Sequence, residues 1–112
     1  MKFDLTLYIG HNVDGKPRHT TQAITNAVVK QLGVEGYTAY DAWGEWRGEK
    51  ETSTIIKICG LDANELEEMQ EKRIPALCYF LEQECILTEA VASNATMIWP
   101  CSAEEFANAN CA

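Results

Sequence analysis

The stretch that decides the fold is YTAYDAWGEWRGEKETSTIIKIC, residues 37–59. Residues 37–46 are rich in aromatic side chains and residues 51–59 in β-branched ones, and both compositions favour strands. Glycines lie on either side of Trp46 and Arg47, a placement that favours a turn. The stretch is therefore predicted to form two antiparallel strands joined as a hairpin.

Before the hairpin, the sequence predicts one strand and one helix. Residues 3–9 alternate apolar and polar side chains, which is the period of a half-buried strand. Apolar residues then recur at three- and four-residue spacing over residues 23–32, which predicts a helix with one apolar stripe. Thr20 or Thr21 can cap its start, and Gly33 can end it.

After the hairpin, the sequence predicts a second helix and a fourth strand. Asp62 and Glu65 form an Asx variant of the capping box, which marks the start of the helix. Pro75 lies inside the helical pattern, so we expect a kink near Lys72 or two short helices. Residues 85–91 are expected to form the fourth strand.

The resulting order β-α-β-β-α-β predicts an α+β, ferredoxin-like domain over residues 1–92, an antiparallel sheet with both helices on one face. Residues 93–112 form a C-terminal extension, with a short strand at residues 96–99 and a short helix after a Ser102–Glu105 capping box. The uncovered face of the sheet predicts a partner surface, and self-association is the simplest way to cover it. Its expected aromatic and small residues are Thr6, Tyr8, Tyr40, Trp43 and Trp46.

Composition argues against several classes of protein. The 112 residues carry 17 acidic and 9 basic side chains, a net charge of −8, whereas nucleic-acid binders need a basic face. Apolar stretches fall short of the ~20 residues that span a bilayer, so no membrane partner is expected.

The start of the sequence does not resemble a signal peptide, and five cysteines without a CxxC pair indicate reduced thiols in a cytoplasm. His11 and His19 have no ligand-spaced partners, so no metal site is expected. The acidic surface suits cationic ligands or simply maintains solubility.

Two groups of carboxylates and a pair of tyrosines are the candidates for chemistry. Glu51 opens the third predicted strand, and Glu82 and Glu84 lie between the second helix and the fourth strand. These two groups need not be close within one chain, but they could meet across a boundary between subunits. Carboxylates at the ends of elements are usually solvated, and tyrosines such as Tyr37 and Tyr40 more often pack than react. The residue types alone therefore leave a structural role open.

The order of these motifs is similar to that of the phage S-adenosylmethionine (SAM) lyases, formerly called SAM hydrolases. The resemblance covers residues 36–87 and rests on GYTAY, on the Gly-x-Trp-Arg turn, on E-T-x-T-I-x-x-I-C at residues 51–59 and on EQECIL at residues 82–87. It implies a trimer of ferredoxin-like subunits with SAM bound between neighbours. It also implies a catalytic pair, Tyr40 and Glu51, with Tyr37 as the alternative tyrosine. Glu82 and Glu84 would then bind substrate.

The reaction that the resemblance implies is the cleavage of SAM to 5′-methylthioadenosine and L-homoserine lactone. SAM contains both a sulfonium leaving group and a carboxylate nucleophile, so the protein needs mainly to orient them, which can supply ~7–11 kcal/mol. No cofactor or metal is required. In the cytoplasm of an infected bacterium this activity would lower the SAM available to host restriction-modification.

The sequence leaves two functions of other classes open. One is a non-catalytic, oligomeric ferredoxin-like module that binds a small metabolite. The other is an anti-defence protein that acts by direct contact with a host protein. Formation of methylthioadenosine from SAM distinguishes the lyase from both.

Overall fold

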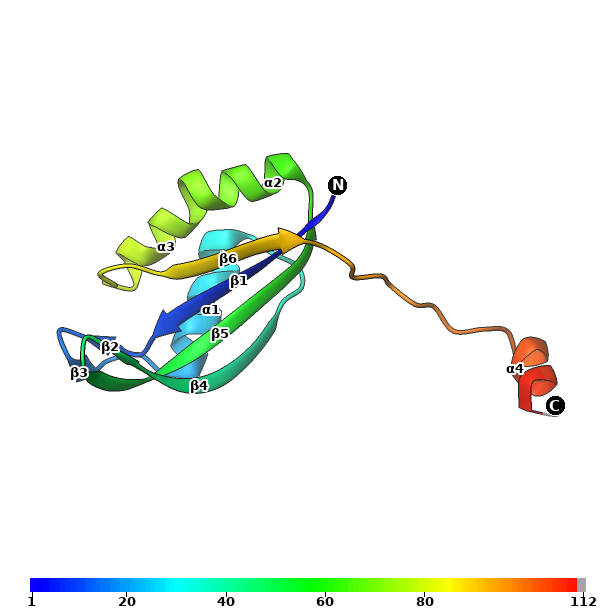
Figure 1. The fold of residues 1–112 in the computed structure, drawn as a ribbon, viewed down its shortest axis with the longest axis horizontal. Helices are drawn as coiled ribbons and strands as arrows, with labels where there is room; N and C mark the ends of the chain where they lie inside the picture. Colours follow the sequence, from blue (N-terminus) through cyan, green and yellow to red (C-terminus); the bar gives the residue numbers. More distant parts are fainter. Residues whose placement is uncertain (111–112) are drawn as a thin grey trace.

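The fold is described by a computed structural model, which covers residues 1–110, apart from the side chains of Trp46 and Asn110. Its main sheet has four antiparallel strands in the order β4-β5-β1-β6 (Figure 1). The strands of this sheet are β1 (Phe3–Gly10), β4 (Thr38–Trp46), β5 (Glu49–Leu61) and β6 (Leu87–Ala92). The first strand thus lies between the third and fourth strands of the predicted plan, which confirms the ferredoxin-like fold.

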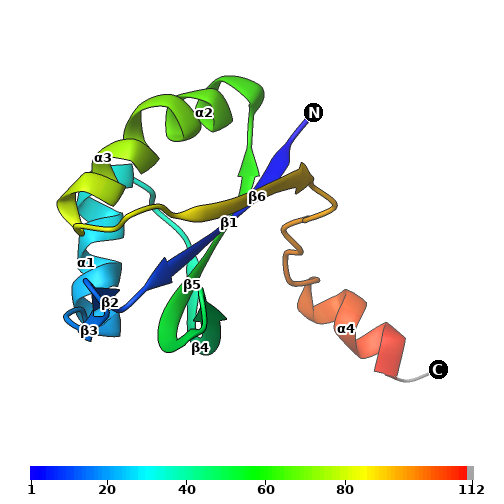
Figure 2. The same ribbon diagram turned by 60° about the vertical axis from the view of Figure 1, so that its left-hand side comes forward.

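Helices pack on one face of this sheet and bury the core between the two layers (Figure 2). The helical elements of this layer are α1 (Thr21–Leu32), α2 (Ala63–Glu68), the π-helical segment η1 (Met69–Arg73) and α3 (Ile74–Phe80). Alternate residues of β1 and β5 point into the core, among them Leu5, Leu7 and Ile56, which are fully buried. Ile24 and Leu77 meet them from α1 and α3.

The predicted helix signals are confirmed in their local geometry. Thr20 caps α1 by accepting the N–H of Ala23 at 3.1 Å, and Gly33 ends the helix in the left-handed conformation. Asp62 and Glu65 form the expected capping box at the start of α2. These signals fix where each helix begins and ends, and thereby where the connecting loops leave the sheet.

The expected break at Pro75 is also present, and it takes the form of a π-helical turn. The N–H of Ile74 donates to the carbonyl of Met69, five residues back, in place of the usual four. The α-helical hydrogen-bond pattern is therefore interrupted just before Pro75, which has no backbone N–H to donate. The second predicted helix is therefore two short helices, α2 and α3, joined by η1.

Two-residue type I′ turns shape one end of the sheet. Arg47 and Gly48 both have positive φ in the β4–β5 turn, the geometry that matches the twist of a hairpin. Asp14 and Gly15 repeat it in a small hairpin of β2 (Asn12–Val13) and β3 (Lys16–Pro17). The sequence pattern predicted only a loop for residues 10–18, because two-residue strands are too short to show a period.

The C-terminal extension differs from its prediction in one respect. The helix α4 (Ala103–Asn110) starts at the expected Ser102–Glu105 capping box. Residues 96–99, however, form no strand, because no neighbouring strand pairs with them in the described part of the chain. Cys111 and Ala112, the last two residues of the extension, lie outside the described residues. Within residues 1–110, no helix is both long and apolar enough to cross a membrane.

The helix-free face of the sheet carries a row of apolar side chains across all four strands. Tyr40 pairs with Ile55, Ile55 with Tyr8, and Tyr8 with Leu87, so these side chains lie side by side. This row confirms the predicted placement of Tyr8 and Tyr40. The placement of Trp43 was wrong: it pairs with Thr52, on the alternate face, where the Lys50 ammonium lies 5.7 Å from its ring.

Candidate functional site

A groove opens at the end of the sheet where three connections converge. They are the β2–β3 hairpin, the β4–β5 turn and the loop between α3 and β6, all at the same end of the molecule in Figure 1. The groove has a volume of about 1240 Å³, and small residues such as Gly10, Gly44 and Ser53 line it. It is wide enough to admit a drug-sized ligand.

The groove is strongly acidic. Arg47 is the only basic residue among the described residues that line it, and its guanidinium is 3.0 Å from the carboxylate of Glu84. Carboxylates that surround a cavity raise the local concentration of cations. The groove therefore favours a positively charged ligand. The carboxylates that line it belong to Asp14, Glu45, Glu49, Glu51, Glu82 and Glu84.

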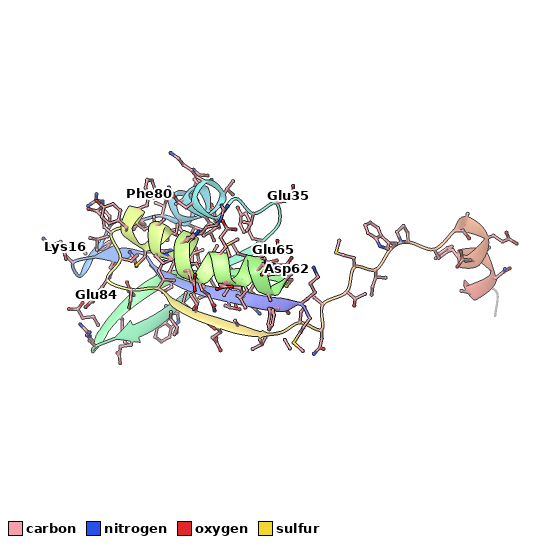
Figure 3. All side chains as sticks on the ribbon, turned by 90° about the horizontal axis from the view of Figure 1, so that it is seen from above. Lys16, Glu35, Asp62, Glu65, Phe80 and Glu84 are labelled. Atoms are coloured by element: carbon pink, nitrogen blue, oxygen red, sulfur yellow. The ribbon has the colours of Figure 1, made fainter. Side chains whose placement is uncertain are left out.

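Three of the predicted site residues, Glu51, Glu82 and Glu84, line this groove within a single chain. From the sequence alone they need not be close within one chain, and they could meet across a subunit boundary. The structure brings them together because the loop after α3 returns over the end of the sheet where β5 begins. Figure 3 shows Glu84 at this end, with Lys16 of the β2–β3 hairpin.

Glu51 is seated against the last residue of β1. Its carboxylate oxygens lie 2.8 Å from the position that a Cβ of Gly10 would occupy, and one of them accepts the N–H of Asn12 at 3.3 Å. Only a residue without a side chain leaves this space free. Gly10 and Asn12 thus fix where the negative charge of Glu51 lies in the groove.

Between these two residues, His11 is buried in a polar network that sequence reasoning missed. Its Nε2 lies 2.8 Å from the hydroxyl of Thr54, and its Nδ1 lies 2.8 Å from the hydroxyl of Thr52. Thr54 is fully buried and donates to Asp41 at 3.1 Å. Because Thr54 has only one proton to donate, it accepts from His11, so Nε2 carries a proton. Because His11 lies between Gly10 and Asn12, this network fixes the backbone that holds the carboxylate of Glu51.

A signal for this network existed in the sequence but was too weak to use. Thr52 and Thr54 alternate on a strand, and Asp41 lies on the strand predicted to pair with it. His11 was assigned to a loop, where its partners are set by the path of the chain and not by spacing. Its contacts are tertiary, and neither motif nor period encodes them.

Asp41 has a pKa below its ordinary value of 3.8, chiefly because the hydroxyl of Thr21 donates to its carboxylate, with Thr54 as a second donor. Folding thus favours the ionised carboxylate. This contribution to stability is present above pH 3.8 and is lost as the pH falls through the lower, folded-state pKa.

Thr21→Val is expected to raise the pKa of Asp41 toward 3.8, as measured by carboxyl NMR titration. Thr25→Val, whose hydroxyl donates to Gln22 instead, should leave it unchanged; an equal rise in both variants would contradict this assignment.

Glu82 occupies a position that usually belongs to glycine. The N–H of Gln83 donates to the carbonyl of Cys78, and the N–H of Glu82 to that of Tyr79, which together form a Schellman motif at the end of α3. Glu82 is the left-handed residue of the motif, with φ of 54°. Its side chain reaches Arg18 at 2.9 Å, across the mouth of the loop.

Glu82→Gly is expected to raise the free energy of unfolding by about 0.5–1 kcal/mol, measured by urea denaturation. A non-glycine residue in this conformation costs roughly 1–2 kcal/mol, and an exposed ion pair returns at most about 1 kcal/mol. Glu82→Gln is the matched control, because it removes the charge and keeps the strain. A destabilised Glu82→Gly variant would show that the carboxylate contributes more to the fold than its exposed ion pair indicates.

The predicted tyrosines lie outside the groove within one chain. Tyr40 is half-exposed on the helix-free face, opposite Ile55, whereas Glu51 pairs with Gly44 four residues further along β4. Tyr37 packs against the core before β4 begins. The tyrosine that does line the groove is Tyr8, whose hydroxyl donates to Glu89. That hydrogen bond is the main cause of its raised pKa.

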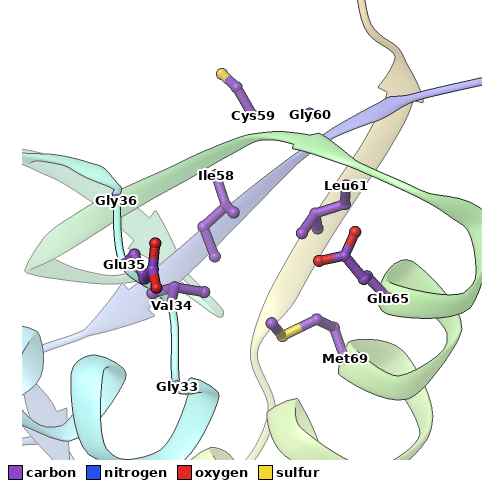
Figure 4. A pocket seen from close by; sticks show the side chains of 10 residues that line it. All are labelled: Gly33, Val34, Glu35, Gly36, Ile58, Cys59, Gly60, Leu61, Glu65 and Met69. Atoms are coloured by element: carbon purple, nitrogen blue, oxygen red, sulfur yellow. The ribbon is translucent and has the colours of Figure 1, made fainter.

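A second, smaller cleft of about 360 Å³ lies at the opposite end of the sheet, between the end of α1, the end of β5, and α2 with the start of η1 (Figure 4). Glu65 is one of its two carboxylates, and it already accepts the N–H of Asp62 in the capping box. Ile58, Leu61 and Met69 line it from the core. These residues thus already belong to the helix cap or to the hydrophobic core. Within residues 1–110 no cluster of side chains has the composition of a metal site.

Comparison with known proteins gives matches at the level of structure. No protein-family model matches the sequence, and no curated protein matches it significantly. A phage SAM lyase in the apo state matches with a TM-score of 0.68 and 22% identity, covering 80% of this chain and 79% of the other.

The same comparison finds a phage SAM lyase in complex with S-methyl-5′-thioadenosine, with a TM-score of 0.64, 22% identity and 80% of each chain covered. A DUF3240 family protein from Shewanella baltica OS155 also matches, with a TM-score of 0.59 and 13% identity over 89% of this chain and 99% of the other. The chain therefore has the fold of the phage SAM lyases, as the sequence resemblance implied.

Proposed function

We propose that this protein is a SAM lyase that releases 5′-methylthioadenosine and L-homoserine lactone. The observation that carries the proposal is the seat of Glu51. The glutamate of the E-T-x-T motif is held by Gly10 and Asn12 inside an acidic groove, in the fold of a phage SAM lyase. A related fold holding methylthioadenosine, the product expected here, supports the same assignment.

The proposed step is intramolecular. A carboxylate oxygen of the methionine moiety attacks its own γ-carbon, the bond from that carbon to the sulfonium breaks, and the electron pair passes to sulfur. A neutral thioether and a lactone result, and the α-ammonium keeps its charge. Since both reacting groups belong to one molecule, the groove contributes by holding them in line, and orientation of this kind can supply about 7–11 kcal/mol.

The carboxylates of the groove serve best as ligands for parts of SAM that do not react. The reaction neutralises a sulfonium and a carboxylate, so a glutamate touching the sulfonium would stabilise the ground state more than the transition state. We assign Glu51 to the α-ammonium or the ribose hydroxyls, with Glu82 and Glu84 as further binding residues. The α-ammonium keeps its charge throughout, so binding it costs nothing in the transition state.

Tyr40 and Tyr37 take part in this proposal only through self-association. Tyr40 lies on the helix-free face and outside the groove of its own chain. A trimer with sites between neighbours would bring a tyrosine of one copy toward the Glu51 of the next. Light scattering at micromolar concentration is expected to give the mass of a trimer, and a monomer mass would contradict the shared site.

The cellular setting follows from the activity. A cytoplasmic enzyme that removes SAM in an infected bacterium would deprive restriction-modification systems of their methyl donor, so we propose an anti-restriction role.

The proposal is tested by incubating the purified protein with SAM and following methylthioadenosine by chromatography. Time-dependent formation of methylthioadenosine is the expected result, and Glu51→Gln serves as the matched negative control. Binding of SAM without any turnover would contradict the lyase and favour a metabolite-binding module. Absence of both binding and turnover would favour a protein that acts by contact with a host partner.

A further inference from the structure

The C-terminal arm, residues 93–110, leaves the domain at the end of β6 and runs away from it (Figures 1 and 2). Three successive large apolar side chains in this arm are open to solvent: Met97, Ile98 and Trp99 are 76%, 89% and 76% exposed. Consecutive exposed apolar residues of this size indicate a surface that another molecule covers.

The helix-free face of the sheet also exposes apolar side chains. In its apolar row, Tyr40 is 48% and Leu87 is 64% exposed, whereas Ile55 is buried, and Val91 is a further exposed apolar residue on this face of β6, beyond Glu89. No described segment of the same chain covers this row, since the helices pack on the other face and the arm runs outward. Each copy of the protein therefore presents one apolar arm segment and one apolar face.

We propose that the arm of one copy docks on the helix-free face of a second copy, with residues 96–99 lying along the β6 side of that face, over Tyr8 and Leu87. The occupant is a second copy because the two surfaces occur in equal number. A heterologous contact that closes into a ring then covers every arm and every face at once. This extends the self-association proposed above by naming the segment that mediates it.

Charge and reach are consistent with this occupant. Each chain carries a net charge of −8, so two copies repel, whereas residues 93–103 contain no charged residue and can approach an acidic neighbour. An extended stretch of ten residues such as 93–102 spans up to roughly 33–36 Å, enough to cross from one small domain to the next. Residues 96–99 also have strand-forming composition, and no strand within residues 1–110 of the same chain pairs with them.

The contact would also border the groove of the receiving copy. Tyr8 and Leu87 belong both to the apolar row and to the lining of the groove. An arm lying over them adds the side chains of Met97 and Trp99 near the wall of that groove. The second copy thus adds apolar surface to that which Tyr8, Ile86 and Leu87 already give the groove of a single chain.

Photocrosslinking of the full-length chain tests the inference. Trp99→p-benzoylphenylalanine should give a covalent dimer on a denaturing gel after irradiation, with acceptor peptides from β1, β4 or β6 identified by mass spectrometry. Val29→p-benzoylphenylalanine is the control, since Val29 is an exposed apolar residue on α1. It should give no dimer through those strands. Cross-links of monomer mass, acceptor peptides only from the helices, or no cross-link at all would each overturn the proposal.

A second variant separates this inference from the proposed function. Ile98→Asp places a charge on the arm and leaves all residues of the groove unchanged, so the mass by light scattering should fall to that of a monomer. Val29→Asp should keep the wild-type mass. If the wild type is an oligomer and Ile98→Asp does not change its mass, docking of the arm is refuted while the lyase proposal stands. Failure to form methylthioadenosine would refute the lyase and leave this result unaffected.

Discussion

Glu51→Gln is expected to lower kcat/KM for SAM cleavage by about a hundredfold or more, with the fold intact. Loss of a charged partner in a closely paired site costs roughly 2–5 kcal/mol, and each 1.4 kcal/mol is a factor of about ten. Glutamine keeps the shape of the side chain and can still accept the N–H of Asn12, so the free energy of unfolding should stay within about 0.5 kcal/mol of wild type. Kinetics with SAM and urea denaturation measure the two effects.

Glu49→Gln is the matched control for this variant. Glu49 lies on the same strand and lines the same groove, but its carboxylate is 3.4 Å from the position of a Cβ on Gly15, an ordinary contact, whereas that of Glu51 is 2.8 Å from the position of a Cβ on Gly10. Its replacement removes an equal charge from the groove and should lower kcat/KM by much less. Equal losses in the two variants would mean that the groove acts by its total charge and that Glu51 has no specific role. A folded Glu51→Gln enzyme with near wild-type rates would contradict the site assignment.

Gly10→Ala is expected to reduce kcat/KM by roughly a hundredfold through the position of Glu51, since a displacement of about 1 Å in an active site can cost that much. The added methyl group would lie 2.8 Å from both carboxylate oxygens, closer than real contacts allow, so the side chain must move. Gly10 touches no reacting atom in this account and acts as a positioning residue. The kinetic assay is accompanied by urea denaturation, to separate displacement from unfolding.

Gly36→Ala controls for the addition of a methyl group. No atom lies within 4 Å of the position of its Cβ, and Gly36 is outside the groove. We expect wild-type kinetics from Gly36→Ala. Combining Gly10→Ala with Glu51→Gln should cost little more than Glu51→Gln alone, because both changes act on one carboxylate. Additive losses in the double variant would show that Gly10 affects catalysis by another route.

Local signals predicted most of the fold because they lie within one element. The alternation of residues 3–9, the cap at Thr20, the capping box at Asp62 and the break at Pro75 each depend on neighbours in sequence. The prediction of a strand at residues 96–99 was wrong because strand formation depends on a partner elsewhere in the chain. A strand needs a partner, and composition shows only that residues could pair, not that a partner is within reach.

The site was less predictable because its geometry depends on tertiary contacts. Glu51, Glu82 and Glu84 were identified, but the groove that unites them depends on the path of the loop after α3. The seat at Gly10 and the buried network of His11 depend on side chains more than 35 residues apart. Trp43 was misplaced because its strand has aromatic residues on both faces, so no clean period separates them.

The most direct test of the central claim is to run the reaction with SAM in oxygen-18 water and to add hydroxylamine at early times. Intramolecular lactonisation predicts methylthioadenosine together with a homoserine hydroxamate whose hydroxyl oxygen carries no label. Lactone that escapes the trap should open to homoserine with oxygen-18 in its carboxyl group only. Homoserine labelled at its hydroxyl from the first time point, with no hydroxamate, would contradict the lyase and assign a glutamate of the groove as a general base toward water.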